Sequence, residues 1–205
     1  MTRVLTLTIV ADGSSDVAFV PIVEWLLGQH TDNAFTVQLA RGLPPPSAGL
    51  LQRVRYAASE YPCDVVVAHR DSEGRTAQER YAEMSESLAD LDLRWIPVVP
   101  VRMTEAWLLL DKAAIRRASG NPNGSVGLAL PPRSRWERDP NPKESLFRSL
   151  RVASELSGRR LEKFDVHAAR FRLASLISDF SPLRGLPTFD RFESDLVQAL
   201  GDLAS

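Results

Sequence analysis

Carboxylate side chains follow two short apolar runs in the first half of the chain. The runs cover residues 4–11 and 64–68, and both are rich in β-branched residues, which is typical of buried strands. In a parallel sheet the carboxyl ends of the strands meet at one edge, so acids that follow such strands are expected to lie close together. The acids that follow these two runs are Asp12, Asp16, Asp71 and Glu73.

Such a cluster of carboxylates would suit a divalent metal ion. Mg²⁺ and Mn²⁺ prefer oxygen ligands in octahedral geometry, usually a few carboxylates completed by water and substrate phosphate. In Asp71-Ser-Glu73 the alternate side chains can point the same way, and Glu105 follows a further strand, so it is expected at the same edge. Two ions about 4 Å apart can activate a water and stabilise the leaving oxygen in phosphodiester cleavage. A purely structural role stays open, because Asp16 and Glu105 also suit the first turn of a helix.

The elements that must position these acids alternate along the chain. Strands are predicted at 4–11, 35–40, 64–68 and 95–101, and helices at 17–29, 50–60 and 76–91. This order predicts an α/β fold with a parallel sheet of about four strands flanked by helices. Pro97 and Pro100 favour an edge position or a bulge for the fourth strand. Ser47 and Thr104 are predicted to cap the helices that follow them.

The second half of the chain predicts helices and one long loop. Three parts are expected: a catalytic core over 1–118, a loop or insert rich in Arg, Pro and Gly over 119–145, and a helical C-terminal extension over 146–205. Within the last two parts, helices are predicted at 144–157, 165–179 and 189–203.

Composition points to a soluble protein. The chain has 205 residues, 25% of them charged, and a single cysteine, which leaves no disulfide framework. No apolar run approaches the ~18 residues that span a bilayer. The N-terminus lacks the pattern of a signal peptide, so a cytoplasmic protein without membrane contact is expected.

Charge is distributed unevenly along the chain. Residues 1–111 hold 9 Lys and Arg against 15 Asp and Glu, a net charge of −6, whereas residues 112–172 hold 14 against 6, a net charge of +8. An acidic half followed by a basic segment suits a polyanionic substrate, although a solvated Arg-rich helical face would give the same count. Trp136, inside the Arg cluster, could stack on a base or pack internally.

The motifs resemble those of the Toprim (topoisomerase–primase) superfamily, especially small Toprim-like proteins related to overcoming-lysogenization-defect (OLD) nucleases and to phage-defence ATPase partners. That family carries E-G-x-x-[DE] after its first strand and D-x-D after its third. Here Asp12-Gly-Ser-Ser-Asp16 and Asp71-Ser-Glu73 match these positions, and residues 97–111, with Glu105, resemble the third acidic motif of the small group. The likeness covers roughly residues 3–111, and Leu186-Pro-Thr-Phe189 resembles that group's C-terminal turn.

The resemblance implies a Toprim-like Rossmannoid fold and an Mg²⁺- or Mn²⁺-dependent nuclease acting on nucleic acid, DNA more than RNA, in phage defence. A partner ATPase is implied, since the chain has no phosphate-binding G-x-x-x-x-G-K-[ST] motif. Arg70 or Arg102 would stabilise charge in the transition state, and His69 adjoins the same site. Asp12, Asp71 and Glu73 would bind metal, Glu105 would ligate metal or act as general base, and Asp16 would assist a second ion.

Two departures from the family pattern keep other functions open. Asp12 stands where the family has Glu, and Glu73 where it has the second Asp. These changes could compensate for each other, or they could mark a catalytically degenerate Toprim module that serves as a binding or regulatory subunit. A third alternative is a PIN/NYN-like ribonuclease, a class that also places an acid after its first strand.

Overall fold

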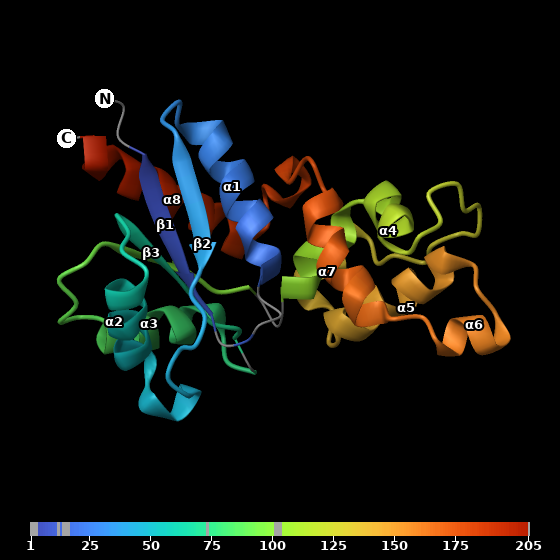
Figure 1. The fold of residues 1–205 in the computed structure, drawn as a ribbon, viewed down its shortest axis with the longest axis horizontal. Helices are drawn as coiled ribbons and strands as arrows, with labels where there is room; N and C mark the ends of the chain where they lie inside the picture. The colour runs from blue at the N-terminus through green and yellow to red at the C-terminus, as the bar shows by residue number, and fades with distance from the viewer. Residues whose placement is uncertain (1–3, 12, 14–16, 73, 101–103, 205) are drawn as a thin grey trace.

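A four-stranded parallel sheet forms the centre of the larger lobe (Figure 1). The computed structural model describes residues 4–11, 13, 17–72, 74–100 and 104–204. The strands run in the order β2-β1-β3-β4, with Val10 of β1 opposite Ala68 of β3, and β3 beside β4. This arrangement confirms the predicted parallel α/β sheet and the predicted edge position of the fourth strand. The strand bounds are β1 Leu5–Val10, β2 Phe35–Leu39, β3 Val65–His69 and β4 Trp95–Val98.

Helices cover both faces of the sheet, and the central strand β3 is apolar on both sides. Val65 and Val67 of β3 join the core cluster that contains α1 (Phe19–His30) and α8 (Pro187–Ala204). Val66 and Ala68 point to the opposite face, into the core cluster that contains residues of α2 (Leu50–Glu60) and α3 (Ala77–Ser87). A run of consecutive buried residues is therefore the expected pattern for β3.

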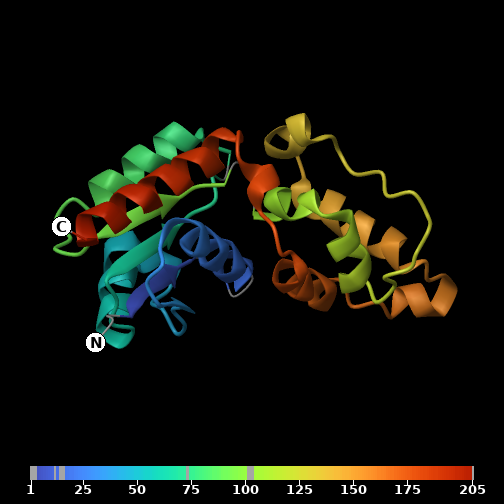
Figure 2. The same cartoon turned by 90° about the horizontal axis from the view of Figure 1, so that it is seen from above.

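A second, helical lobe lies between β4 and α8 in the chain (Figure 1, Figure 2). Three of its helices, α4, α5 and α7, pack against one another, and 3-10 segments at Thr104–Leu110 (η3), Arg133–Arg138 (η4) and Ser181–Leu183 (η5) join the elements. After this lobe the chain returns to the sheet, where α8 packs on β4. The helix bounds are α4 Lys112–Ala118, α5 Pro142–Ser154, α6 Gly158–Glu162 and α7 Val166–Leu176.

Two predicted helix caps are wrong. Ser47 lies in the 3-10 turn Pro46–Ala48, and Gly49, at φ +85°, occupies the position before α2. Thr104 begins the 3-10 segment η3 instead of an α-helix, and the Asp111 side chain caps α4 by accepting a hydrogen bond from the amide of Ala114. Local sequence favoured both caps, but the chain tightens into a 3-10 turn before each helix starts.

Aromatic side chains pack η3 against α1 and α8. Trp107 of η3 is buried, with its ring centroid 5.9 Å from that of Phe19 in α1 and 5.3 Å from that of Phe189 in α8. Trp136 is also buried, and its indole nitrogen donates to the Pro131 carbonyl at 3.0 Å, so it is not available to stack on a base. Over the described ranges, none of the helices combines the length and the apolar character needed to cross a membrane.

Candidate metal centre

The carboxyl ends of β1 and β3 define the candidate site. From β1 the chain crosses to β2 on one side, and from β3 it crosses to β4 on the other side, so the winding of the sheet reverses between β1 and β3. In open α/β sheets, ligands bind beyond the carboxyl ends of the strands at such a reversal. Because Val10 lies opposite Ala68, the loops that follow these two strands begin side by side. Of the acids predicted to bind metal, Asp12, Asp16, Asp71 and Glu73 follow these two strands in the sequence, and Glu105 follows β4.

Asp71 stands just beyond the end of β3 with an incompletely satisfied carboxylate. Its side chain is 28% exposed, and Oδ1 lies 3.4 Å from Nε2 of the buried His69. Oδ1 is itself buried and makes no hydrogen bond to any residue in the described ranges. A buried carboxylate oxygen without a hydrogen bond is unfavourable, and a bound cation would satisfy it. This oxygen is the strongest structural reason to place a metal ion here.

His69 ends β3 and supports the Asp71 side of the edge. Its imidazole is buried against Phe19 of α1, with ring centroids 4.3 Å apart. The ring therefore holds a fixed position between the core and the Asp71 carboxylate. A histidine this close can orient the carboxylate that it contacts.

Arg70 is turned toward α3. Its Nη1 lies 3.6 Å from Oε1 of Glu83, while Arg75 and Arg80 approach the other Glu83 oxygen at 2.8 and 2.7 Å. Arg80 is buried and donates to the Ser72 carbonyl at 3.4 Å. Glu83 thus gathers three guanidinium groups behind the Asp71 loop, and the role of Arg70 in transition-state stabilisation stays a prediction.

The loop after Asp71 passes directly into α3. Gly74 adopts φ +83°, a conformation that favours glycine. Thr76 then caps α3: its hydroxyl accepts from the amide of Glu79, and the Glu79 carboxylate accepts from the amide of Thr76. These hydrogen bonds lower the pKa of Glu79 below its ordinary value of 4.5. The backbone around Asp71 is therefore fixed at both ends of the loop.

Glu105 has a structural partner. Glu105 is 4% exposed, and its Oε1 lies 2.8 Å from Nε of Arg170 in α7, which is 7% exposed, so the two side chains form a salt bridge. This buried ion pair ties η3, which follows β4, to the helical lobe. A metal ion would have to share the carboxylate with Arg170, and the predicted ligand or general-base role of Glu105 stays untested.

The remaining predicted ligands, Asp12, Asp16 and Glu73, lie outside the described residues, as does Arg102. Within the part of the chain that the structure describes, no three His, Cys, Asp or Glu side chains gather closely enough to hold a metal ion. Of the predicted site residues, the structure thus brings Asp71 to the carboxyl edge beside His69, and it directs Glu105 to Arg170.

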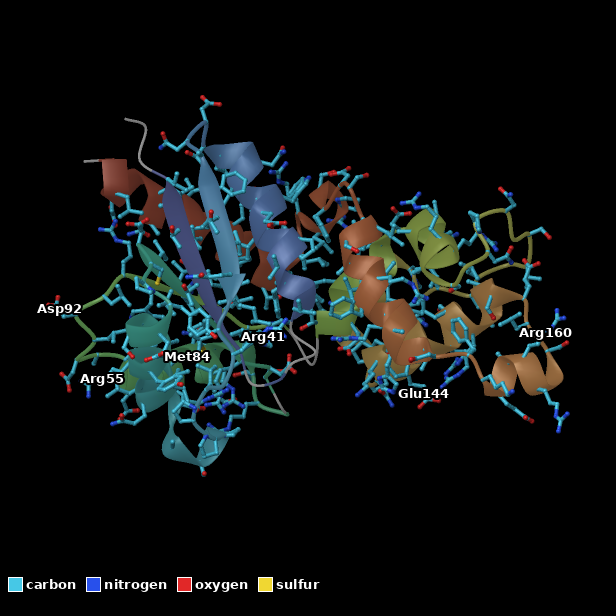
Figure 3. All side chains as sticks on the ribbon, in the orientation of Figure 1. Arg41, Arg55, Met84, Asp92, Glu144 and Arg160 are labelled. Carbon is cyan, nitrogen blue, oxygen red and sulfur yellow. The ribbon has the colours of Figure 1, made fainter. Side chains whose placement is uncertain are left out.

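A pocket beside the end of β1 was not identified from the sequence. It has a volume of about 390 Å³ and lies between the β1 and β2 ends. Arg53 of α2 is buried there and donates from Nη2 to the Ala11 carbonyl at 2.8 Å, while the Tyr61 hydroxyl holds the backbone of Arg41. Figure 3 labels Arg41 near this edge of the sheet. The lining residues are Ala11, Gly13, Leu39, Ala40, Arg41, Gly42, Leu43, Pro44, Pro45, Pro46 and Arg53.

The signal that could have revealed this pocket is the Gly42–Pro46 loop directly after the second strand. The carboxyl ends of parallel strands are where such loops meet, and a proline-rich loop forms a rigid wall.

Comparison of the chain with known proteins found no matching family, no matching curated protein and no matching solved structure.

Proposed function

We propose that this protein is a Toprim-type nuclease, an Mg²⁺- or Mn²⁺-dependent phosphodiester hydrolase that acts on nucleic acid, DNA in preference to RNA. The observation that carries the proposal is the position of Asp71. It follows β3 at the reversal of the sheet, next to the strand that leads to Asp12, and its buried Oδ1 has no hydrogen bond among the described residues.

The chain's own residues would hold the metal and position the substrate. Asp71 would supply carboxylate oxygens with its orientation fixed by His69, and Asp12 and Glu73 would complete the ligand set. Asp16 and Glu105 would serve a second ion, and Arg70 would stabilise charge on the phosphate. When bound, the metal would activate water and stabilise the leaving oxygen.

The proposal includes a partner ATPase in a phage-defence system. The sequence has no Walker-type phosphate-binding loop, so any ATP-driven step would belong to another protein. This element rests on the resemblance to small Toprim-like proteins alone.

Plasmid cleavage tests the proposed function. Purified protein would be incubated with supercoiled plasmid and Mn²⁺, and nicked and linear products would be quantified. We expect cleavage by the wild type and by Asp92→Asn, which removes an exposed carboxylate remote from the site (Figure 3). Asp71→Asn should abolish it. A wild type without cleavage, or an Asp71→Asn variant as active as the wild type, would contradict the proposal.

A second candidate is a catalytically degenerate Toprim module that acts as a binding subunit. The Glu105–Arg170 ion pair favours it, because it gives the third acidic motif a structural use. This candidate predicts a protein that cleaves neither DNA nor RNA. The PIN/NYN-like alternative would instead show Mn²⁺-dependent cleavage of single-stranded RNA, so an RNA substrate in the same assay separates all three.

A further inference from the structure

The helical lobe presents several cations that form no salt bridge within the part of the chain that the structure describes. The segment 112–172 carries the net charge of +8, and several of its arginines are used internally: Arg116 pairs with Glu155, and Arg172 donates to the Ala118 carbonyl. The cations of α5, α6 and their flanks differ, because they form no salt bridge with any residue in the described ranges. These cations are Lys143, Arg148, Arg151, Arg159, Arg160 and Lys163.

Two acids of the same segment, Glu155 and Asp165, have local structural tasks. Glu155 accepts from the amides of Ser125 and Val126 at 2.6 and 2.8 Å, and these hydrogen bonds lower its pKa below the ordinary 4.5. Asp165 caps α7 by accepting from the Ala168 amide at 2.9 Å. The positions of these two acids are therefore explained by folding.

Aromatic side chains interleave with some of these cations. Phe147 of α5 meets His167 of α7 edge to face, with ring centroids 5.0 Å apart. Lys143 Nζ and Arg151 Cζ lie 5.7 and 6.0 Å from the centre of the Phe147 ring, because residues four apart share one side of a helix. Phe171 follows His167 by one turn and is 58% exposed. We call Lys143, Phe147, Arg151, His167 and Phe171 the basic-aromatic face.

A shallow pocket lies on this face at the start of α5. It has a volume of about 360 Å³, and it is lined by Asn141, Lys143, Glu144, Phe147 and Arg151. Figure 3 labels Glu144, which lies at the start of α5.

We propose that the basic-aromatic face binds single-stranded nucleic acid. Lys143, Arg151 and their neighbour Arg148 would hold backbone phosphates, and Phe171 would stack on an unpaired base. A duplex would use the cations alone, since its bases are stacked on one another, and would leave the exposed Phe171 ring unexplained. The inference rests on the proposed function for its choice of ligand, and it adds where and in what form the nucleic acid binds.

Binding without metal separates this inference from the proposed nuclease activity. Fluorescence anisotropy with a labelled 20-nucleotide DNA strand in EDTA would measure wild type and variants over a range of salt concentrations. Phe171→Ala should weaken binding roughly five- to hundredfold, and Phe171→Tyr should restore it. Arg151→Ala should lower the salt slope of log K by about 0.7, the release expected for one phosphate of a single strand.

Two matched controls remove similar groups elsewhere. Val197→Ala truncates another exposed apolar side chain, 42% exposed on α8, and Arg55→Ala removes an exposed cation of α2 in the other lobe (Figure 3). Both should bind as the wild type does. RNA and duplex DNA of the same length are measured in parallel, and the inference requires single strands to bind more tightly than the duplex.

The proposal is overturned if the wild type does not bind single strands, if it binds duplex equally well, or if Phe171→Ala and Arg151→Ala bind like the controls. If the variants behave as expected but plasmid is not cleaved with Mn²⁺, the binding face stands and the nuclease proposal fails. If plasmid is cleaved with Mn²⁺ but these variants bind like the wild type, the nuclease proposal stands and the proposed binding face fails.

Discussion

Breaking the buried ion pair between Glu105 and Arg170 should strongly destabilise the protein. Arg170→Met would leave the Glu105 carboxylate almost fully buried without the guanidinium group whose Nε lies 2.8 Å from it. At that distance the attraction is about 6 kcal/mol for an effective dielectric constant of about 20. Desolvation offsets much of this in the intact pair, but removing one partner of a buried pair typically costs about 3–5 kcal/mol.

A loss of that size is a large part of the free energy of unfolding of an ordinary domain, which is about 5–15 kcal/mol. Urea unfolding followed by far-UV circular dichroism, in EDTA, would measure it as a lower midpoint at unchanged slope. Arg172→Met is the matched control, since Arg172 lies on the same helix but is exposed and donates to the Ala118 carbonyl. Its cost should stay near 1 kcal/mol.

A double-mutant cycle completes the test. Combining Glu105→Leu with Arg170→Met removes both charges, so the double variant should be more stable than Arg170→Met alone. A cost below about 1 kcal/mol for Arg170→Met would refute the reasoning, because it would mean that the buried carboxylate does not depend on its guanidinium partner. If Glu105 served only as a metal ligand, Arg170→Met would likewise leave the stability of the metal-free protein unchanged.

Three further outcomes follow from the structure. Arg184 donates to Glu193 and lowers the pKa of that carboxyl below its ordinary 4.5. The wild type should therefore be more stable than Glu193→Gln, fully so above pH 4.5, and this difference should fade as the pH falls through the lowered pKa. Urea midpoints measured across that pH range test this. Thr76→Ala removes the cap of α3 and should cost about 0.5–2 kcal/mol by urea unfolding, whereas Thr76→Ser should cost much less. Burial raises the pKa of Tyr81 to about 12, so Tyr81→Phe should remove an ionisation step at that pH from the ultraviolet titration, and an unchanged titration would contradict the burial.

The strands and the sheet helices were predictable because their signals are local. The β-branched run 64–68 can be buried only as a strand covered on both faces, and α2 begins and ends at the predicted residues. The short helices α4 and α6 were missed, since seven and five residues carry too little periodicity. The sequence also showed an apolar face on α8, but amphipathicity does not say which surface that face covers.

The long-range features of the candidate site had no sequence signal. Glu105 and Arg170 are 65 positions apart, and nothing in either neighbourhood marks them as partners. Asp71 could be named from the strand that it follows, yet the buried position of its Oδ1, 3.4 Å from His69 and without a hydrogen bond among the described residues, appears only in the structure. The contact between Phe147 and His167 likewise depends on how α5 and α7 pack.

Manganese binding measured by isothermal titration calorimetry tests the central claim most directly. Wild type, Asp71→Ala and the control Asp92→Ala would be titrated with Mn²⁺ after removal of bound metal. We expect saturable binding by the wild type and by Asp92→Ala, and its loss in Asp71→Ala. Absence of binding in the wild type, or unchanged binding in Asp71→Ala, would contradict a metal centre at the carboxyl edge of the sheet.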